Sequence, residues 1–115
     1  MYKFADKYGC GKPYNYIHPY KQEAVKMTLE RVPSWVEWVI LFGSAIHPMC
    51  RQDSDIDLVV VGDNQQEPTD SFVLETHDYD ILHYKDVESF LEKVKNNPFS
   101  ASSQAYQKGV VIYAR

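Results

Sequence analysis

Two runs of almost uninterrupted apolar residues constrain this chain most. The first covers residues 35–42 (WVEWVILF) and the second covers residues 56–61 (IDLVVV). Short runs of this kind, rich in β-branched and aromatic residues, are typical of β-strands. A strand without apolar–polar alternation is buried on both faces. The chain is therefore expected to contain at least two sheet strands, the first of them buried on both sides.

Helical periodicity lies on either side of these strands. Apolar residues recur at helical spacing from residue 19 to Pro33, where the proline ends the pattern, and again from residue 87 to the stop at residues 96–98. We further expect a short helix or turn over 44–50, strands over 72–75 and 79–84 around a turn at 76–78, a short helix over 101–107 and a strand over 110–113. This order predicts an α/β (α+β) fold, with a mixed β-sheet and helices packed mainly on one face.

The length of 115 residues indicates one domain, which we place at residues 19–115 after an irregular N-terminal segment, residues 1–18. A net charge of −4 argues against a broad basic surface for duplex nucleic acid. We see neither a membrane-spanning apolar stretch nor a signal peptide, so a cytoplasmic protein without membrane contact is expected. Cys10 and Cys50 are expected to be free thiols there.

Two aspartates accompany the second apolar run, one directly before it and one within it. Asp55 and Asp57 are two positions apart, so in a strand their side chains point to the same face. Like charges on one face repel unless a cation or protons relieve them. Mg²⁺ prefers carboxylate oxygens and keeps positions free for phosphate. An isolated D-x-D is more often the solvent face of a half-buried strand, because charged residues are mostly exposed.

Gly43-Ser44 changes that balance. The pair follows the first buried strand directly and is expected to open a short helix. Glycine lets a phosphate approach the backbone, and the nearby N–H groups and the serine hydroxyl can hold it. Ser54 is a third candidate for this nucleotide-binding group, either through a hydrogen bond to a carboxylate or by holding the start of the strand. A phosphate-binding turn beside a metal-binding pair is a joint feature that chance seldom supplies.

A third carboxylate is expected if two metal ions are used. Asp80, within the predicted strand over 79–84, is the best candidate. Asp78 is the alternative, although it falls in the predicted turn. Both would share one face by alternation, so their spacing does not decide between them.

These residues together resemble the signature of the minimal nucleotidyltransferases, a family of the DNA polymerase β-like nucleotidyltransferase superfamily. The family motif is two hydrophobic residues and G-S, followed by S-D-I-D and a hydrophobic residue. Here Gly43-Ser44 and the segment 54–58 (SDIDL) match it, separated by nine residues. A later hydrophobic-D-hydrophobic strand of the family maps onto Asp80. The tail NPFSASSQAYQKGVVIYAR also resembles the family's C-terminal "spf…eGvvlY".

The resemblance implies transfer of a nucleoside monophosphate from a nucleoside triphosphate, expected to be ATP, with release of pyrophosphate. It implies that Asp55 and Asp57 hold a metal ion on the triphosphate. Asp80 would share a second metal ion and take the proton of the acceptor. Gly43 and Ser44 would contact the β- and γ-phosphates. The expected cofactor is Mg²⁺ in a two-metal site, with Mn²⁺ as an alternative.

The resemblance also suggests partners. Short members of the family often pair with a helical HEPN protein in toxin–antitoxin modules, where the nucleotidyltransferase modifies a tyrosine of the toxin. A HEPN-type partner that presents an acceptor hydroxyl, or a homo-oligomer, is therefore expected.

The chain departs from the family at one point. The family usually reads G-S-x-A-R-G, whereas this chain reads GSAIHP, with His47 at the arginine position and Pro48 at the glycine position. A histidine replaces the guanidinium only while its ring is protonated. This favours the alternative function, a non-catalytic nucleotide- or partner-binding module with a degenerate site. Retention of Asp55, Asp57 and Asp80 favours the enzyme.

Overall fold

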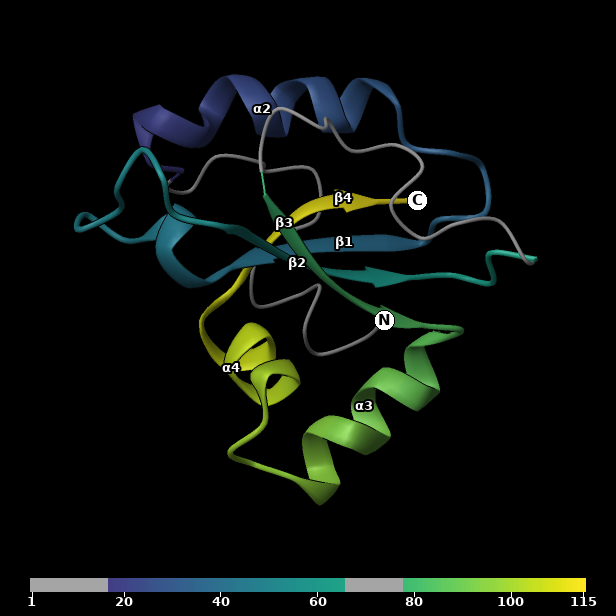
Figure 1. Cartoon of the computed structure of the whole chain (residues 1–115). Helices are drawn as coiled ribbons and strands as arrows, with labels where there is room; N and C mark the ends of the chain where they lie inside the picture. The colour runs from purple at the N-terminus through teal and green to yellow at the C-terminus, as the bar shows by residue number, and fades with distance from the viewer. Residues whose placement is uncertain (1–16, 66–77) are drawn as a thin grey trace.

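Four strands and three α-helices form the described part of the chain (Figure 1). The computed structural model describes residues 17–65 and 78–115. In chain order the elements are α2 (Pro19–Glu30), β1 (Trp38–Phe42), the 3₁₀ helix η1 (Gly43–Ile46), β2 (Ile56–Val61), β3 (Tyr79–Tyr84), α3 (Val87–Asn96), α4 (Ala101–Lys108) and β4 (Val110–Ala114). The predicted α+β class is confirmed. None of the described helices is long and apolar enough to cross a membrane.

The strands form one mixed sheet in the order β3-β2-β1-β4. β1 runs antiparallel to both neighbours, whereas β2 and β3 are parallel. In the antiparallel pair, Phe42 at the end of β1 lies opposite Asp57. In the parallel pair, Asp57 lies opposite Asp80. The end of β1 and the starts of β2 and β3 therefore meet at the same end of the sheet.

Helices cover both faces of this sheet (Figure 1). On one face, Val25 of α2 joins a core that contains Leu41. On the other face, Phe90 of α3 and Ala105 of α4 join a core that contains Val59. The prediction of helices mainly on one face is confirmed, because α3 and α4 share one face, while α2 alone covers the other. Strands with apolar side chains on both sides need a layer on each face, because either side left bare would expose apolar area to water.

β1 begins at Trp38, three residues later than predicted. The preceding residues form a turn in which the Val36 N–H donates to the Pro33 carbonyl at 3.1 Å. Trp35 lies in this turn and packs against the core on the α2 side, whereas Trp38 belongs to the core on the α3/α4 side. The two indoles therefore face opposite ways, although only Trp38 is in the strand.

Several predictions concern residues outside the described ranges. These are the strand over 72–75, most of the turn over 76–78, Cys10 and nearly all of the segment 1–18. Within that segment, Ile17 is buried in the core on the α2 side. The His18 N–H donates to the Ala45 carbonyl at 2.7 Å, and His18 Nδ1 accepts the Tyr20 N–H. These two residues are thus attached to the domain.

Two phenylalanines allow a matched test of this fold. Phe90 is fully buried between α3 and the sheet, whereas Phe99 in the α3–α4 connection is 91% exposed. Phe90→Ala should lower the free energy of unfolding by about 3–5 kcal/mol, because it removes apolar contacts and leaves a cavity. Phe99→Ala should change it by less than about 0.5 kcal/mol. Urea denaturation measures both values, and equal effects would contradict the described packing.

Candidate functional site

Gly43 holds the centre of the site. It follows β1 directly and has φ +75°, a conformation that side chains rarely adopt. A Cβ atom at this position would lie 2.2 Å from Oδ2 of Asp57, so there is no room for one. The Gly43 backbone therefore lies directly against the Asp57 carboxylate.

The strand register brings Asp80 next to Asp57. These residues are partners in the parallel β2–β3 pair. By alternation both side chains lie on the α3/α4 face, since Val59 and Leu82, two residues further along their strands, pack there. Asp78 precedes β3, and its carbonyl accepts the Ile56 N–H at 2.9 Å. Asp80 rather than Asp78 is thus the carboxylate that lies beside Asp57 in the sheet.

The electrostatics show how closely these carboxylates interact. The pKa of Asp57 rises from its ordinary value of 3.8 to about 6. Burial of the carboxylate is the largest cause, followed by the negative charge of Asp80 and then that of Asp55. Ionised Asp57 is therefore destabilised, and a cation placed among these three groups would relieve the repulsion.

The two serines connect the surrounding turns. The Ser44 hydroxyl donates to the Asp55 carbonyl over a long 3.4 Å, which links η1 to the residue before β2. The Ser54 hydroxyl accepts the Arg51 N–H at 3.0 Å, and the Ser54 N–H donates to the Arg51 carbonyl. Ser54 therefore closes the turn that leads into Asp55. This supports its expected role at the start of the strand, and Ser54 makes no hydrogen bond to a carboxylate among the described contacts.

The sequence analysis missed one residue that holds this turn. Lys21 in α2 is only 1% exposed, and its ammonium group donates to the Gln52 carbonyl at 3.0 Å. This bond joins α2 to the turn that precedes Asp55. Lys21 is four residues before Val25 on the buried side of the helix. A lysine at that helical spacing was the available signal, since a charged residue is seldom fully buried without a partner.

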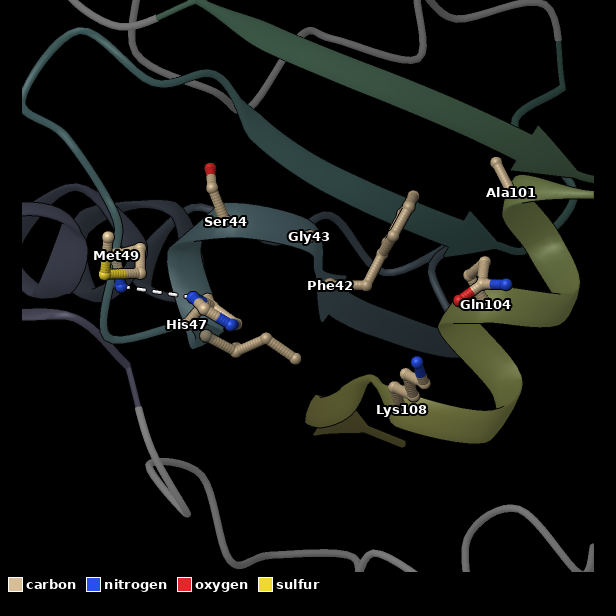
Figure 2. Close-up of a pocket in the computed structure, with 9 residues that line it drawn as sticks. Phe42, Gly43, Ser44, His47, Met49, Ala101, Gln104 and Lys108 are labelled. Carbon is tan, nitrogen blue, oxygen red and sulfur yellow. Dashed lines mark hydrogen bonds between the residues drawn. The ribbon is translucent and has the colours of Figure 1, made fainter.

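A pocket of about 630 Å³ adjoins Gly43 and Ser44 (Figure 2). The end of β1 and η1, with His47, form one side, and α4, with Gln104 and Lys108, forms the other (Figure 2). The pocket lining is mostly apolar. The two α4 residues are about sixty positions from Gly43, so no local pattern connects them to it.

The donor set fits a hard divalent cation. In the two described ranges, no three His, Cys, Asp or Glu side chains are close enough together to hold a metal ion by themselves. Mg²⁺, however, usually binds through one or two carboxylates together with water and substrate phosphates. Asp57 and its neighbours supply carboxylate oxygens whose repulsion a cation would relieve. These residues therefore suit a metal ion that arrives with an anionic ligand, rather than a closed structural metal centre.

The raised pKa predicts how stability depends on pH without metal. Below the ordinary pKa of 3.8, Asp57 is protonated in both the folded and the unfolded protein, so its burial costs no stability. As pH rises from there through about 6, the free energy of unfolding falls, because the folded protein holds this proton more tightly than the unfolded chain does. Asp57→Asn should therefore stabilise the metal-free protein by about 1–2 kcal/mol near pH 7.5, after allowance for solvent screening, and by much less near pH 4. Denaturation in EDTA at both pH values measures this difference.

Asp53→Asn is the control for that experiment. Asp53 is exposed in the same segment and is not among the charges that act on Asp57. Mg²⁺ should raise the melting temperature of the wild type and of this control more than that of Asp57→Asn. If Asp57→Asn raised the free energy of unfolding of the metal-free protein equally at pH 4 and pH 7.5, the assigned electrostatics would be contradicted.

Gly43→Ala tests the close contact itself. The new Cβ should displace the Asp57 carboxylate and strain the backbone, lowering the free energy of unfolding by about 1–3 kcal/mol. It should also abolish the stabilisation by Mg²⁺. Gly62→Ala is a matched control at the other end of β2, where a Cβ would lie 2.3 Å from the Trp35 carbonyl. This variant should be destabilised yet keep its response to Mg²⁺, measured by thermal shift.

A comparison with known families identifies the domain. The family model described as Polymerase beta, Nucleotidyltransferase matches residues 23–115, which is most of the chain. No curated protein matches the sequence significantly. The matched region contains all of the candidate site residues, namely Gly43, Ser44, Ser54, Asp55, Asp57 and Asp80. The expected superfamily is confirmed, and membership of the minimal subfamily stays a prediction. The chain belongs to the polymerase β nucleotidyltransferase family.

Proposed function

We propose that this protein is a Mg²⁺-dependent nucleotidyltransferase that transfers a nucleoside monophosphate, expected to be AMP from ATP, to an acceptor hydroxyl. One observation carries the proposal. The Gly43 turn lies against the Asp57 carboxylate in a strand register that places Asp80 alongside. A turn suited to phosphate and a group of carboxylates suited to a metal ion are thereby joined in one site.

The triphosphate would lie across this junction. Gly43 and Ser44 contact its β- and γ-phosphates, and the absence of a side chain at Gly43 permits the close approach. Asp55 and Asp57 would hold the metal ion on the triphosphate, and Asp80 would share a second one, with Mn²⁺ as an alternative to Mg²⁺. When bound, divalent ions neutralise the negative charge of the attacking and leaving oxygens. The raised pKa of Asp57 supports this role, because it reflects crowded negative charge.

Asp80 is the proton acceptor that we propose. It is exposed, so an acceptor can reach it, and it lies beside Asp57 in the sheet. In the transfer, the acceptor oxygen forms a bond to the α-phosphorus while the bond to pyrophosphate breaks. The hydroxyl proton passes to the Asp80 carboxylate. Pyrophosphate leaves on the side of Gly43 and Ser44.

The acceptor is proposed from the family resemblance alone. Short members of the family often pair with helical HEPN proteins as toxin–antitoxin modules, and a tyrosine hydroxyl of such a partner is the acceptor that we propose.

A second candidate function is a non-catalytic module that binds nucleotide or a partner. One observation favours it. His47 stands where the family motif has arginine, and its Nδ1 atom accepts the Met49 N–H at 3.1 Å within a turn. One of the two ring nitrogens of His47 is therefore already used by a hydrogen bond within its own loop. Turnover separates the two candidates, because both predict binding of nucleotide.

Calorimetric titration of ATP, with and without Mg²⁺, tests the shared binding site. Wild-type protein should bind ATP only with Mg²⁺, and the Asp55→Asn/Asp57→Asn variant should lose at least about tenfold in affinity, since two charged metal ligands are removed. Asp53→Asn should bind as the wild type does. Metal-independent binding of equal strength in all three proteins would refute the assigned site.

Labelled ATP tests the reaction. With [α-³²P]ATP and a tyrosine-bearing acceptor, label should transfer to protein, whereas [γ-³²P]ATP should release its label in pyrophosphate. Asp80→Asn should retain nucleotide binding and lose at least about a hundredfold in transfer rate, because the proton acceptor is removed. Binding without transfer in the wild type, with a HEPN protein supplied as the acceptor, would support the non-catalytic module instead.

A further inference from the structure

The proposed ligand brings an excess of negative charge to the site. A triphosphate over Asp55, Asp57 and Asp80 places phosphate and carboxylate charges within a few ångströms, and two divalent cations would leave the total negative. Sites of this kind usually add a fixed cation at the phosphate that leaves. The family motif supplies it as the arginine of G-S-x-A-R-G, which this chain lacks. The question is which residue supplies the charge here.

His47 is a weak source of it. It lines the pocket beside Gly43 and Ser44 and is exposed. The hydrogen bond from the Met49 N–H to Nδ1, drawn in Figure 2, leaves the proton of the neutral ring on Nε2. A neutral His47 can therefore donate one hydrogen bond to a phosphate, but it carries no permanent charge.

Lys108 is placed to supply the charge. Among the described residues that line the pocket, it is the one with a permanently positive side chain. It projects from the last turn of α4, across the pocket from His47 (Figure 2). Within the described part of the chain, no hydrogen bond or ion pair occupies its ammonium group. The group is thus available to an anion at Gly43 and Ser44.

Close packing fixes this placement. Gly109, directly after Lys108, would carry a Cβ atom only 2.4 Å from the Ala105 carbonyl oxygen and 2.8 Å from Ile40 Cγ2. The same atom would lie 3.1 Å from the Leu41 carbonyl oxygen. The last turn of α4 therefore sits on β1, just before Phe42 and the Gly43 turn. Lys108 is held near that turn by backbone packing and not by a flexible loop.

We propose that Lys108 binds the terminal phosphates of the nucleoside triphosphate, in place of the missing arginine. This inference rests on the proposed function and assigns a cation to it from a distant part of the sequence. The ammonium group of Lys108 donates to non-bridging oxygens of the β- and γ-phosphates, while Gly43 and Ser44 contact the same phosphates from β1 and η1. A charge at that position also stabilises the pyrophosphate as it leaves.

A simpler role for Lys108 makes a different prediction. A lysine in the last turn of a helix interacts favourably with the helix dipole. Lys95 has that position in α3, is exposed and does not line the pocket. If the helix dipole were the whole explanation, Lys108→Gln and Lys95→Gln would have the same effect, and neither would change binding of phosphate.

The experiment compares three ligands in the presence of Mg²⁺: ATP, inorganic tripolyphosphate and AMP. Lys108→Gln should weaken the binding of ATP and of tripolyphosphate by about 5- to 30-fold, because one charge-assisted hydrogen bond near the surface is lost. The affinity for AMP, which lacks the terminal phosphates, should change by less than about twofold. Lys108→Arg should restore most of the affinity, and Lys95→Gln should behave as the wild type. Added KCl should narrow the difference between Lys108→Gln and the wild type, because salt screens the ammonium charge.

The outcomes separate this inference from the proposed function. Wild-type binding that depends on Mg²⁺ and Asp57 but is unchanged in Lys108→Gln would overturn the inference and leave the proposed function standing. Equal weakening of AMP and ATP binding in Lys108→Gln would also overturn it, because the contact would then not be with the terminal phosphates. Absence of any binding of ATP and tripolyphosphate to the wild type would overturn both.

Discussion

The approach of the Gly43 backbone to the Asp57 carboxylate is the contact on which the rest of the site depends. It can form only where a residue without a side chain follows a buried strand, and where the next strand returns beside the first. It also removes water from one side of the carboxylate. Burial is the largest single cause of the raised pKa of Asp57, ahead of the negative charges of Asp80 and Asp55. Geometry and electrostatics of the site thus have the same origin.

The face of the sheet that carries the site has two environments. Under α3 and α4 it is an apolar core, to which Val59 and Val61 contribute. Asp57 and Asp80 lie on the same face, because side chains alternate along a strand, but at the end of the sheet where β1 turns into η1. α4 forms the border between the two environments. Its inner side packs on β1, and its last residue, Lys108, lines the adjoining pocket.

Regular patterns in the sequence predicted the elements well and their arrangement less well. β2 has the predicted bounds, and α3 and α4 begin at the predicted residues, Val87 and Ala101. The sequence did not predict which side of the sheet α2 covers. A helical pattern shows which side of a helix is apolar, but not which of two apolar sheet faces it covers. The late start of β1 has a similar cause, since the turn at Pro33 takes up residues that read as strand.

The sequence by itself determined the chemistry that is available. The Gly43-Ser44 pair, the D-x-D motif and its position at the start of an apolar strand are local features, set by residue type and by the twofold repeat of a strand. It could not decide between Asp78 and Asp80, because alternation puts both on one face. The parallel register of β2 and β3, a long-range pairing, places Asp80 beside Asp57. Only tertiary packing brings Lys108 to the Gly43 turn, because residues about sixty positions apart share no local pattern and meet only when α4 packs on β1.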